Sequence, residues 1–449
     1  MTAPWWLTAS GAARAFSRRL VSPVELVQAL LDRIAALDPH LHGFVRVDAE
    51  AALAAARAAA EEIAAGRVRG PLHGVPVGIE DLIDIAGLPT TCASRLRLDH
   101  VASADAACVA KLRAAGAILL GKLTTHEFGL AGPDADGPFP SARNPWSPAH
   151  HAGGAGVGLA AGLFPLAVAA DHAGGVRHPA AACGVVGLKP SAGLVSRRGV
   201  VPVSFTCGQV GPMARTVADV ALLLDALAGH DPLDPGSVVP PRRNFAAMLG
   251  RGAAGLRIGF VRHFHERDLT ADAATAAALE QVLRTLAQEG AEAREVTLPP
   301  LADFTVVGGV LTAGEAWAVH QPWLRARPGE YGRPARRFLM TGAFLGAGDY
   351  VAAQSRRRHL ITAVEAVLRE VDVLLCAALP EPAGASCDAL MPFNVTGHPA
   401  LTMPAGLSPS GMPVSVQFVG RYFEEATLLR AAGAWERAAG TDALHPSSA

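Results

Sequence analysis

Glu80 is the side chain of this sequence with the clearest capacity for acid–base chemistry. It follows residues 76–79 (PVGI), a short apolar run that predicts a β-strand with Glu80 at its end. A carboxyl group in an apolar pocket has a raised pKa, so it can act as a general base or a general acid at neutral pH. The alternative is a structural carboxylate that pairs with a cation.

His151 and His172 are the next candidates, because an imidazole titrates near neutral pH. His172 lies in residues 171–177 (DHAGGVR), shortly before Gly174 and Gly175. A glycine pair in a turn can present backbone N–H groups to a carbonyl or carboxylate oxygen, so both glycines are candidate substrate-binding residues. Histidines that serve only the fold are the competing interpretation for both imidazoles.

Cys207 is a third candidate, in residues 204–209 (SFTCGQ). A thiol becomes a nucleophile when a neighbouring base lowers its pKa, and otherwise a buried cysteine packs as a small apolar side chain. The six cysteines form no C-x-x-C pair, which argues against a cysteine zinc site of the usual spacing. Dispersed thiols are typical of a reduced, cytoplasmic location, and no signal peptide is evident.

An α/β fold is predicted as the framework that positions these residues. Short β-branched runs alternate with Gly/Pro turns and Ala-rich segments, which is the pattern of a largely covered sheet. Ser22 and Pro23 form a helix start signal, followed by apolar residues at helical spacing. The other predicted helices are residues 51–65, 105–115 and 270–289, and the predicted strands are residues 76–79, 117–120, 256–260, 293–298, 371–375 and 414–419.

The bulk composition excludes several classes of protein. The 449-residue chain is 50% hydrophobic and 18% charged, so it can bury a large core. Its net charge of −1 argues against nucleic acid or an anionic membrane as a partner. The apolar stretch at residues 157–170 is too short to span a bilayer. No linker or solenoid repeat divides the chain, so we expect a single domain over residues 1–449.

Six blocks of sequence, in order along nearly the whole chain, resemble the amidase signature family. The resemblance implies that family's fold, an α/β structure with a large mixed β-sheet covered by helices on both faces. It divides the domain into N-terminal helices (1–69), a signature core (70–219) and a remainder (220–449). The blocks are residues 70–84 (GPLHGVPVGIEDLID), 121–128 (GKLTTHEF), 143–146 (RNPW), 184–190 (GVVGLKP), 210–219 (VGPMARTVAD) and 392–399 (PFNVTGHP).

The family hydrolyses amides, and some esters, with a Ser–cis-Ser–Lys triad, and the resemblance places other residues at its positions. Where the family pattern is Gly-x-Pro-x-x-x-Lys-Asp, this chain has Glu80 for the lysine. Where the pattern is Asp-Thr-Gly-Gly-Ser-x-Arg, Gly175 replaces the nucleophilic serine, while Asp171 and Arg177 keep their positions. Glycine cannot attack a carbonyl, so the family's acyl-enzyme chemistry is not expected.

The relay serine of the triad corresponds to either His151 or Ala155. The chain is a few residues shorter than the family pattern between Trp146 and Gly162. Loops tolerate deletions better than helices, and a gap in the loop places His151 at the relay position. A gap inside the following helix places Ala155 there. Neither alignment supplies a serine, because residues 150–172 contain no serine or threonine.

With His151 at the relay position, the resemblance brings it into one pocket with Glu80 and His172. Two imidazoles and a carboxylate could hold zinc or iron or act as acid and base without a metal, and Cys207 would lie beside the substrate pocket. We therefore expect an enzyme with repurposed chemistry on a small amide, carbonyl or carboxylate substrate. The alternative is a non-catalytic homologue that binds a ligand or a protein partner as one subunit of a complex, and homodimer formation stays open.

Overall fold

The N-terminal helices follow directly from local sequence signals. A computed structural model describes residues 3–130, 132–241 and 244–446. Helix α2 (Pro23–Leu41) begins after Ser22, whose hydroxyl accepts a hydrogen bond from the Glu25 N–H at 3.1 Å. The Glu25 carboxylate in turn accepts one from the Ser22 N–H at 2.7 Å. This capping box satisfies N–H groups that a helix start leaves without acceptors, and it confirms the predicted helix start.

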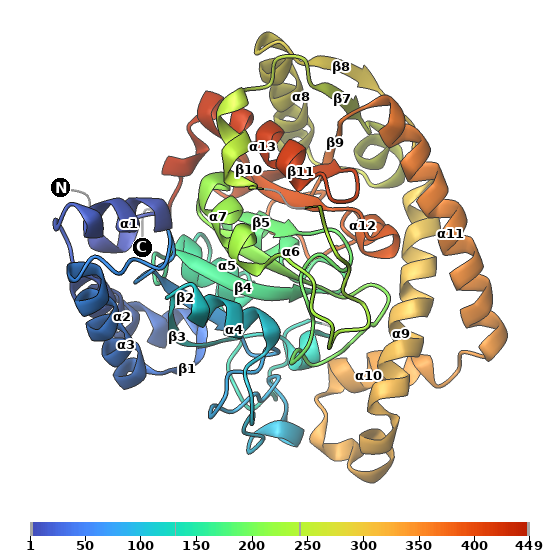
Figure 1. The fold of residues 1–449 in the computed structure, drawn as a ribbon. Helices are drawn as coiled ribbons and strands as arrows, with labels where there is room; N and C mark the ends of the chain where they lie inside the picture. Colours follow the sequence, from blue (N-terminus) through green and yellow to red (C-terminus); the bar gives the residue numbers. More distant parts are fainter. Residues whose placement is uncertain (1–2, 131, 242–243, 447–449) are drawn as a thin grey trace.

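The strands of the described residues form one 11-stranded mixed sheet, in the order β1-β3-β2-β4-β6-β5-β10-β11-β9-β7-β8 (Figure 1). Neighbours are parallel within β3-β2-β4 and within β9-β7-β8, and antiparallel elsewhere. The strands are β1 (Phe44–Val47), β2 (Pro76–Glu80), β3 (Ile118–Leu123), β4 (Leu166–Asp171), β5 (Val186–Lys189), β6 (Gln209–Ala214), β7 (Arg257–Phe260), β8 (Glu292–Glu295), β9 (Val373–Ala377), β10 (Ala400–Leu407) and β11 (Pro413–Gly420).

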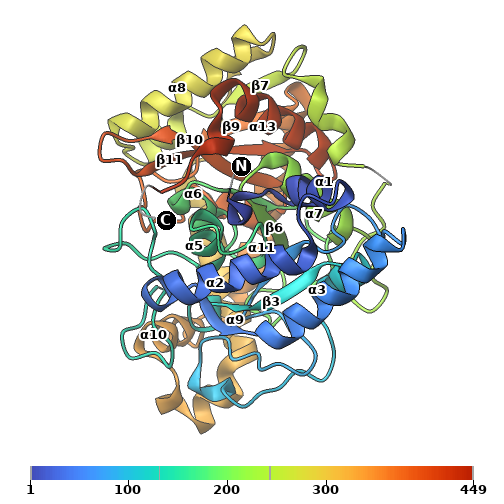
Figure 2. The same ribbon diagram turned by 90° about the vertical axis from the view of Figure 1, so that its left-hand side faces the viewer.

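Helices cover the sheet, and the predicted α/β fold is confirmed (Figures 1 and 2). Strands β2, β4, β6, β9 and β11 are buried along their whole length, so they form the centre of the hydrophobic core. The remaining helices are α1 (Ala9–Ser17), α3 (Ala49–Ala64), α4 (Ala107–Ala114), α5 (Gly154–Ala160), α6 (Arg177–Cys183), α7 (Val217–Leu227), α8 (Ala273–Gln288), α9 (Leu301–Ala326), α10 (Arg333–Gly342), α11 (Ala347–Glu370), α12 (Met391–Thr396) and α13 (Glu425–Ala439).

Every predicted strand has a counterpart in the sheet, and the predicted helices correspond to α3, α4 and α8. The long helices α9 and α11 were not anticipated. Helix α9 contains a Gly308-Gly309 pair and Pro322, which in isolation favour a break. It packs against α10, α11 and α12, and this tertiary packing outweighs the local signals (Figure 1). Within the described ranges no helix is long and apolar enough to cross a membrane.

Three parallel strands end side by side and position the candidate site. In the β2–β3 pair Glu80 lies opposite Leu123, and in the β2–β4 pair Ile79 lies opposite Val168. The carboxyl ends of parallel strands meet at one edge of a sheet. Side chains that are far apart in the sequence, around residues 80, 125 and 171, are therefore brought together.

Candidate functional site

Glu80 ends strand β2, and two hydrogen bonds from neighbouring segments hold its carboxyl group. The Ala170 N–H donates to Oε2 at 2.6 Å, and the Thr125 hydroxyl donates to Oε1 at 2.9 Å. The residue is only 8% exposed. The next residue, Asp81, is instead paired with the Lys122 ammonium at 2.9 Å, so Glu80 is the carboxyl group of this strand end without a cationic partner among the described residues.

Burial raises the pKa of Glu80 to about 7. The negative charges of Asp81 and Asp171 act in the same direction, whereas the hydrogen bonds from Ala170 and Thr125 oppose the change. A carboxyl group with this pKa can take up and release a proton at neutral pH. The acid–base role predicted for Glu80 therefore has a physical basis in the structure.

A buried ion pair fixes the turn between β4 and α6. Arg177 donates from Nε to Asp171 Oδ2 and from Nη2 to Asp171 Oδ1, both at 3.0 Å, and neither side chain is exposed. Arg177 also donates to Gln417 Oε1 at 2.8 Å, and Asn394 donates to Asp171 Oδ1 at 2.8 Å. The planar guanidinium fixes the direction of the carboxylate, so the turn that follows Asp171 has a rigid base.

The turn retains two backbone N–H groups that can hold an oxygen atom. Gly174 and Gly175 were the predicted donors, but the N–H of Gly174 already donates to Asp171 Oδ1 at 2.8 Å and is not free for a substrate. The N–H groups of Ala173 and Gly175 have no acceptor in the part of the chain that the structure describes. Gly175 is exposed and Ala173 is half-buried. These two donors, rather than Gly174 and Gly175, could bind a carbonyl or carboxylate oxygen.

Position 175 has no room for a side chain in the observed backbone conformation. A Cβ atom added to Gly175 would lie 2.3 Å from the Ala170 carbonyl oxygen, well inside van der Waals contact. Ala170 is also the residue whose N–H binds Glu80. The end of β4 thus occupies the place that a side chain at position 175 would need.

We expect Gly175→Ser to destabilise the fold because its Cβ would push against backbone rather than against a movable side chain. Overpacking of this kind costs roughly 1–3 kcal/mol. Urea denaturation of the variant and the parent protein measures the difference. Ala173→Ser, in the same turn, is the matched control and should be close to neutral. Equal stability of the two variants would show that the turn adjusts freely.

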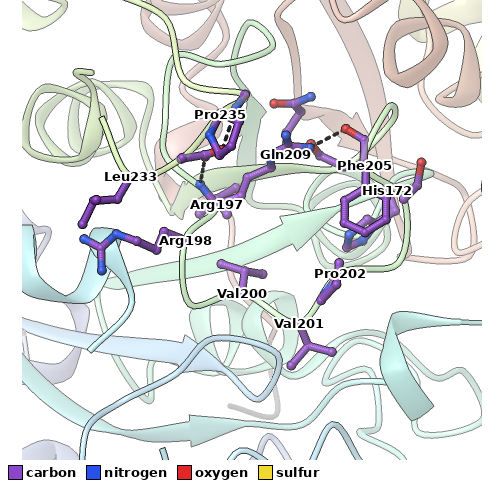
Figure 3. A pocket seen from close by; sticks show the side chains of 15 residues that line it. His172, Arg197, Arg198, Val200, Val201, Pro202, Phe205, Gln209, Leu233 and Pro235 are labelled. Carbon is purple, nitrogen blue, oxygen red and sulfur yellow. Dashed lines mark hydrogen bonds between the residues drawn. The ribbon is translucent and has the colours of Figure 1, made fainter. Parts of the chain in front are cut away.

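His172 lines a pocket that does not include Glu80 (Figure 3). The pocket has a volume of about 480 Å³. Burial lowers the pKa of His172 to about 4; the charge of Asp171 opposes this change and that of Arg197 adds to it. The expectation that His172 and Glu80 face one pocket is not met, because the chain turns after Asp171. The lining residues are His172, Arg197, Arg198, Val200, Val201, Pro202, Ser204, Phe205, Gly208, Gln209, Val210, Leu233, Asp234, Pro235 and Gly236.

His151 is an exposed loop residue in the structure. Its Nδ1 lies 3.3 Å from the Ala142 carbonyl oxygen. It is near His126, whose pKa is lowered to about 4 by burial, with further contributions from His178 and His151. His126 follows Thr125, so His151 lies near the strand ends but presents its ring at the surface.

The predicted metal site of Glu80, His151 and His172 is not formed. No group of three or more His, Cys, Asp or Glu side chains in residues 3–130, 132–241 and 244–446 could hold a metal ion. Both Glu80 oxygens accept hydrogen bonds, His172 lines another pocket and His151 is exposed. The residues present do not fit zinc or iron.

Cys207 is a core residue and does not line the pocket, contrary to the expected substrate contact. It is fully buried in a hydrophobic cluster with Phe264, Phe304 and Phe393. Burial raises the pKa of its thiol to about 11, so the reactive thiolate is disfavoured. The alternative interpretation, a buried apolar thiol, fits the structure.

Two residues of this region were not anticipated from the sequence. His126 stands within a block that resembles the family, and no local pattern sets it apart. Arg197 belongs to a short basic run, Arg197-Arg198, of a kind that is usually a solvated face. Its position in the pocket depends on the loop of residues 204–208 folding back onto it, which no spacing in the sequence reveals.

A protein-family model described as Amidase matches residues 25–429. A glutamyl-tRNA(Gln) amidotransferase subunit from Roseiflexus sp. (strain RS-1) is 36% identical, with 97% of each chain covered. The protein of the same description from Geobacter sp. (strain M21) is 34% identical, covering 93% of this chain and 94% of that one.

Solved structures are similar to this chain over nearly its whole length. One, described as an unexpected vestigial protein complex that reveals the evolutionary origins of an s-triazine catabolic enzyme, has a TM-score of 0.90 and 31% identity, covering 96% of this chain and 98% of that chain. Native peptide amidase from Stenotrophomonas maltophilia has a TM-score of 0.85 and 29% identity, covering 96% and 97%.

Proposed function

Because this chain belongs to the amidase signature family, we propose that it acts on a small amide, carbonyl or carboxylate compound without the covalent serine intermediate of its family. Glycine at position 175 supplies no nucleophile. A water molecule would attack the carbonyl carbon instead, and the N–H groups of Ala173 and Gly175 would hold the developing oxyanion.

Glu80 is the general base of this proposal. It accepts the proton of the attacking water and then donates this proton to the leaving amine, so both proton transfers are made by Glu80 and need no metal. The observation that carries the proposal is the position of Ala170. Its N–H binds the Glu80 carboxylate, and its carbonyl lies beside Gly175, so one residue connects the acid–base group to the turn with the free N–H donors.

Replacing Glu80 with glutamine tests this role, since the amide keeps the shape and cannot take up a proton. With a panel of small primary amides as substrates, kcat/KM of the parent protein should rise through pH 7, following the pKa of Glu80. Glu80→Gln should lose activity on the order of a hundredfold or more. Activity that survives this change, or a flat pH profile, contradicts the proposal.

A non-catalytic member of a multi-protein complex is the second candidate. One observation favours it: the Ala170 carbonyl oxygen fills the space that a side chain at position 175 would occupy. This packing closes the position that the resemblance assigns to the family's nucleophile. Two relatives are named as subunits of an amidotransferase, so the proposal includes a protein partner for this chain. Absence of any Glu80-dependent turnover, with retained ligand binding, would favour this candidate.

A further inference from the structure

We propose that the pocket beside His172 binds a small organic acid, with its carboxylate on Arg197 and its apolar body against the pocket walls. This goes beyond the proposed function, because neither Glu80 nor Ala173 nor Gly175 lines this pocket, and it assigns the pocket a class of ligand of its own. The volume of about 480 Å³ falls in the range of ordinary small-molecule sites.

Arg197 provides the charge that selects an anion. Its Nη1 donates to the carbonyl oxygens of Phe205 at 2.6 Å and Gly208 at 3.2 Å. Its Nε and Nη2 have no acceptor among the described residues, and its guanidinium has no carboxylate partner there. A guanidinium edge with free N–H donors matches the two oxygens of a carboxylate.

The other charges around the pocket are already satisfied. Arg198 is paired with Asp231 at 2.9 Å. The carboxylate of Asp234 accepts the backbone N–H groups of Arg197 and Gly236, at 2.7 and 2.8 Å. Neither Asp234 nor Arg197 has an ion-pair partner among the described residues, but the Asp234 oxygens already accept hydrogen bonds, whereas Arg197 keeps free N–H donors, which favours a ligand with one negative group.

The wall of the pocket near the turn is polar but neutral. His172 has a pKa lowered to about 4 by burial, so its ring is uncharged at neutral pH. The ring makes no hydrogen bond to any described residue, which leaves its nitrogens for a ligand. Gly208 makes room for it, since a Cβ there would lie 2.9 Å from His172 Nε2.

Apolar side chains form the rest of the pocket and its rim. Figure 3 shows Val200, Val201 and Pro202 along one side, with Arg197 between the His172 end and the Leu233 end. At the rim Phe205 is 57% exposed and Leu233 is 71% exposed. Such walls suit a ligand whose remaining part is aromatic or aliphatic, and they offer no partner for a second charged group on the ligand.

Matched acids and amides test the assignment directly. Benzoate with benzamide, and phenylacetate with phenylacetamide, have nearly the same shape and differ in charge. Calorimetric titration of the full-length protein at pH 7.5 should show at least tenfold tighter binding of each acid. Arg197→Met should remove this preference, with a loss of roughly ten- to a hundredfold for the acids and little change for the amides.

The controls separate the charge of Arg197 from its structural bonds. If Arg197 had only a structural role, Arg197→Met would weaken the binding of acids and amides equally. That result would contradict the proposal. Arg198→Met should keep the preference, because Arg198 is already paired. If Arg197→Met does not fold, Leu233→Asp at the exposed rim provides the test: it should weaken the binding of the acids and leave the binding of the amides unchanged.

The proposed function and this assignment can fail separately. Glu80→Gln should retain the preference for acids, since Glu80 does not line the pocket. Equal affinities for acid and amide, or no measurable binding of any probe, would overturn the carboxylate site. Loss of turnover in Glu80→Gln with an intact acid preference supports both.

Discussion

Arg177→Met is expected to lower the free energy of unfolding by about 3–5 kcal/mol, because it leaves Asp171 as an uncompensated buried charge. Neither partner of the pair is exposed, and Arg177 alone spans Asp171, Gln417 and Asn394. Chemical denaturation at pH 7 measures the loss. A surface pair supplies the control: Arg294→Met removes a bond to Glu370 in which both side chains are about half or more exposed, and it should cost far less.

The same ion pair predicts how stability depends on pH. Burial disfavours the charged form of Asp171, but the charge and hydrogen bonds of Arg177, with those of Asn394, outweigh it and hold the pKa of Asp171 well below its usual range. A depressed carboxyl pKa gives stability that is present above the unfolded value, about 4. Stability should fall as the pH drops below that value. The double variant Asp171→Leu/Arg177→Met should show a weaker fall and should be more stable than Arg177→Met; a double variant no better than the single one contradicts the ion-pair account.

Glu80→Gln is expected to stabilise the protein above pH 7 while removing the proposed activity. The pKa of Glu80 is raised from 4.5 to about 7, so the folded state binds a proton that the unfolded state has released. Stability contributed by this group is therefore full below pH 4.5 and is lost as the pH rises to 7. The shift corresponds to about 3 kcal/mol. Glutamine is neutral and keeps an oxygen for the Ala170 N–H, so it avoids that loss.

Thermal unfolding at pH 4.5 and pH 8 measures this effect. The parent protein and Glu80→Gln should differ little at pH 4.5 and most at pH 8. Glu436 is the matched control: burial raises its pKa to about 7 as well, and it binds the Val217 N–H at 2.7 Å in another part of the fold. Glu436→Gln should show a similar pH-dependent gain without loss of activity. A pH-independent gain for Glu80→Gln would contradict the raised pKa.

The sequence predicted the framework of the site well because its signals are local. The helix start at Ser22 and Pro23 and the apolar run before Glu80 each depend on a few neighbouring residues, and both appear as expected. The direction of His172 depends on how the chain turns after Asp171, and that turn is set by contacts from Asn394 and Arg177. A rotation of the backbone at this turn decides which way the side chain points, and no spacing in the sequence predicts it.

The three residues predicted to bind a metal are not brought together, for a related reason. The prediction placed Glu80, His151 and His172 at positions of a family pattern and assumed that the side chains kept the family's directions. In the structure His151 lies in a loop, and its ring lies at the surface. Arg197 was not predicted as a pocket residue. The carbonyl groups that accept its hydrogen bonds belong to a loop whose path depends on tertiary contacts.

The Ala170 carbonyl beside Gly175 limits the substitutions that this turn can accept. A serine at position 175 would place its Cβ atom 2.3 Å from that oxygen in the observed backbone conformation. A hydroxymethyl group could therefore be accommodated only if the backbone moved. Any substitution that adds a side chain here would have to move the end of β4, which also holds Glu80. Position 175 and the surroundings of Glu80 are therefore coupled, so that a change at one is expected to disturb the other.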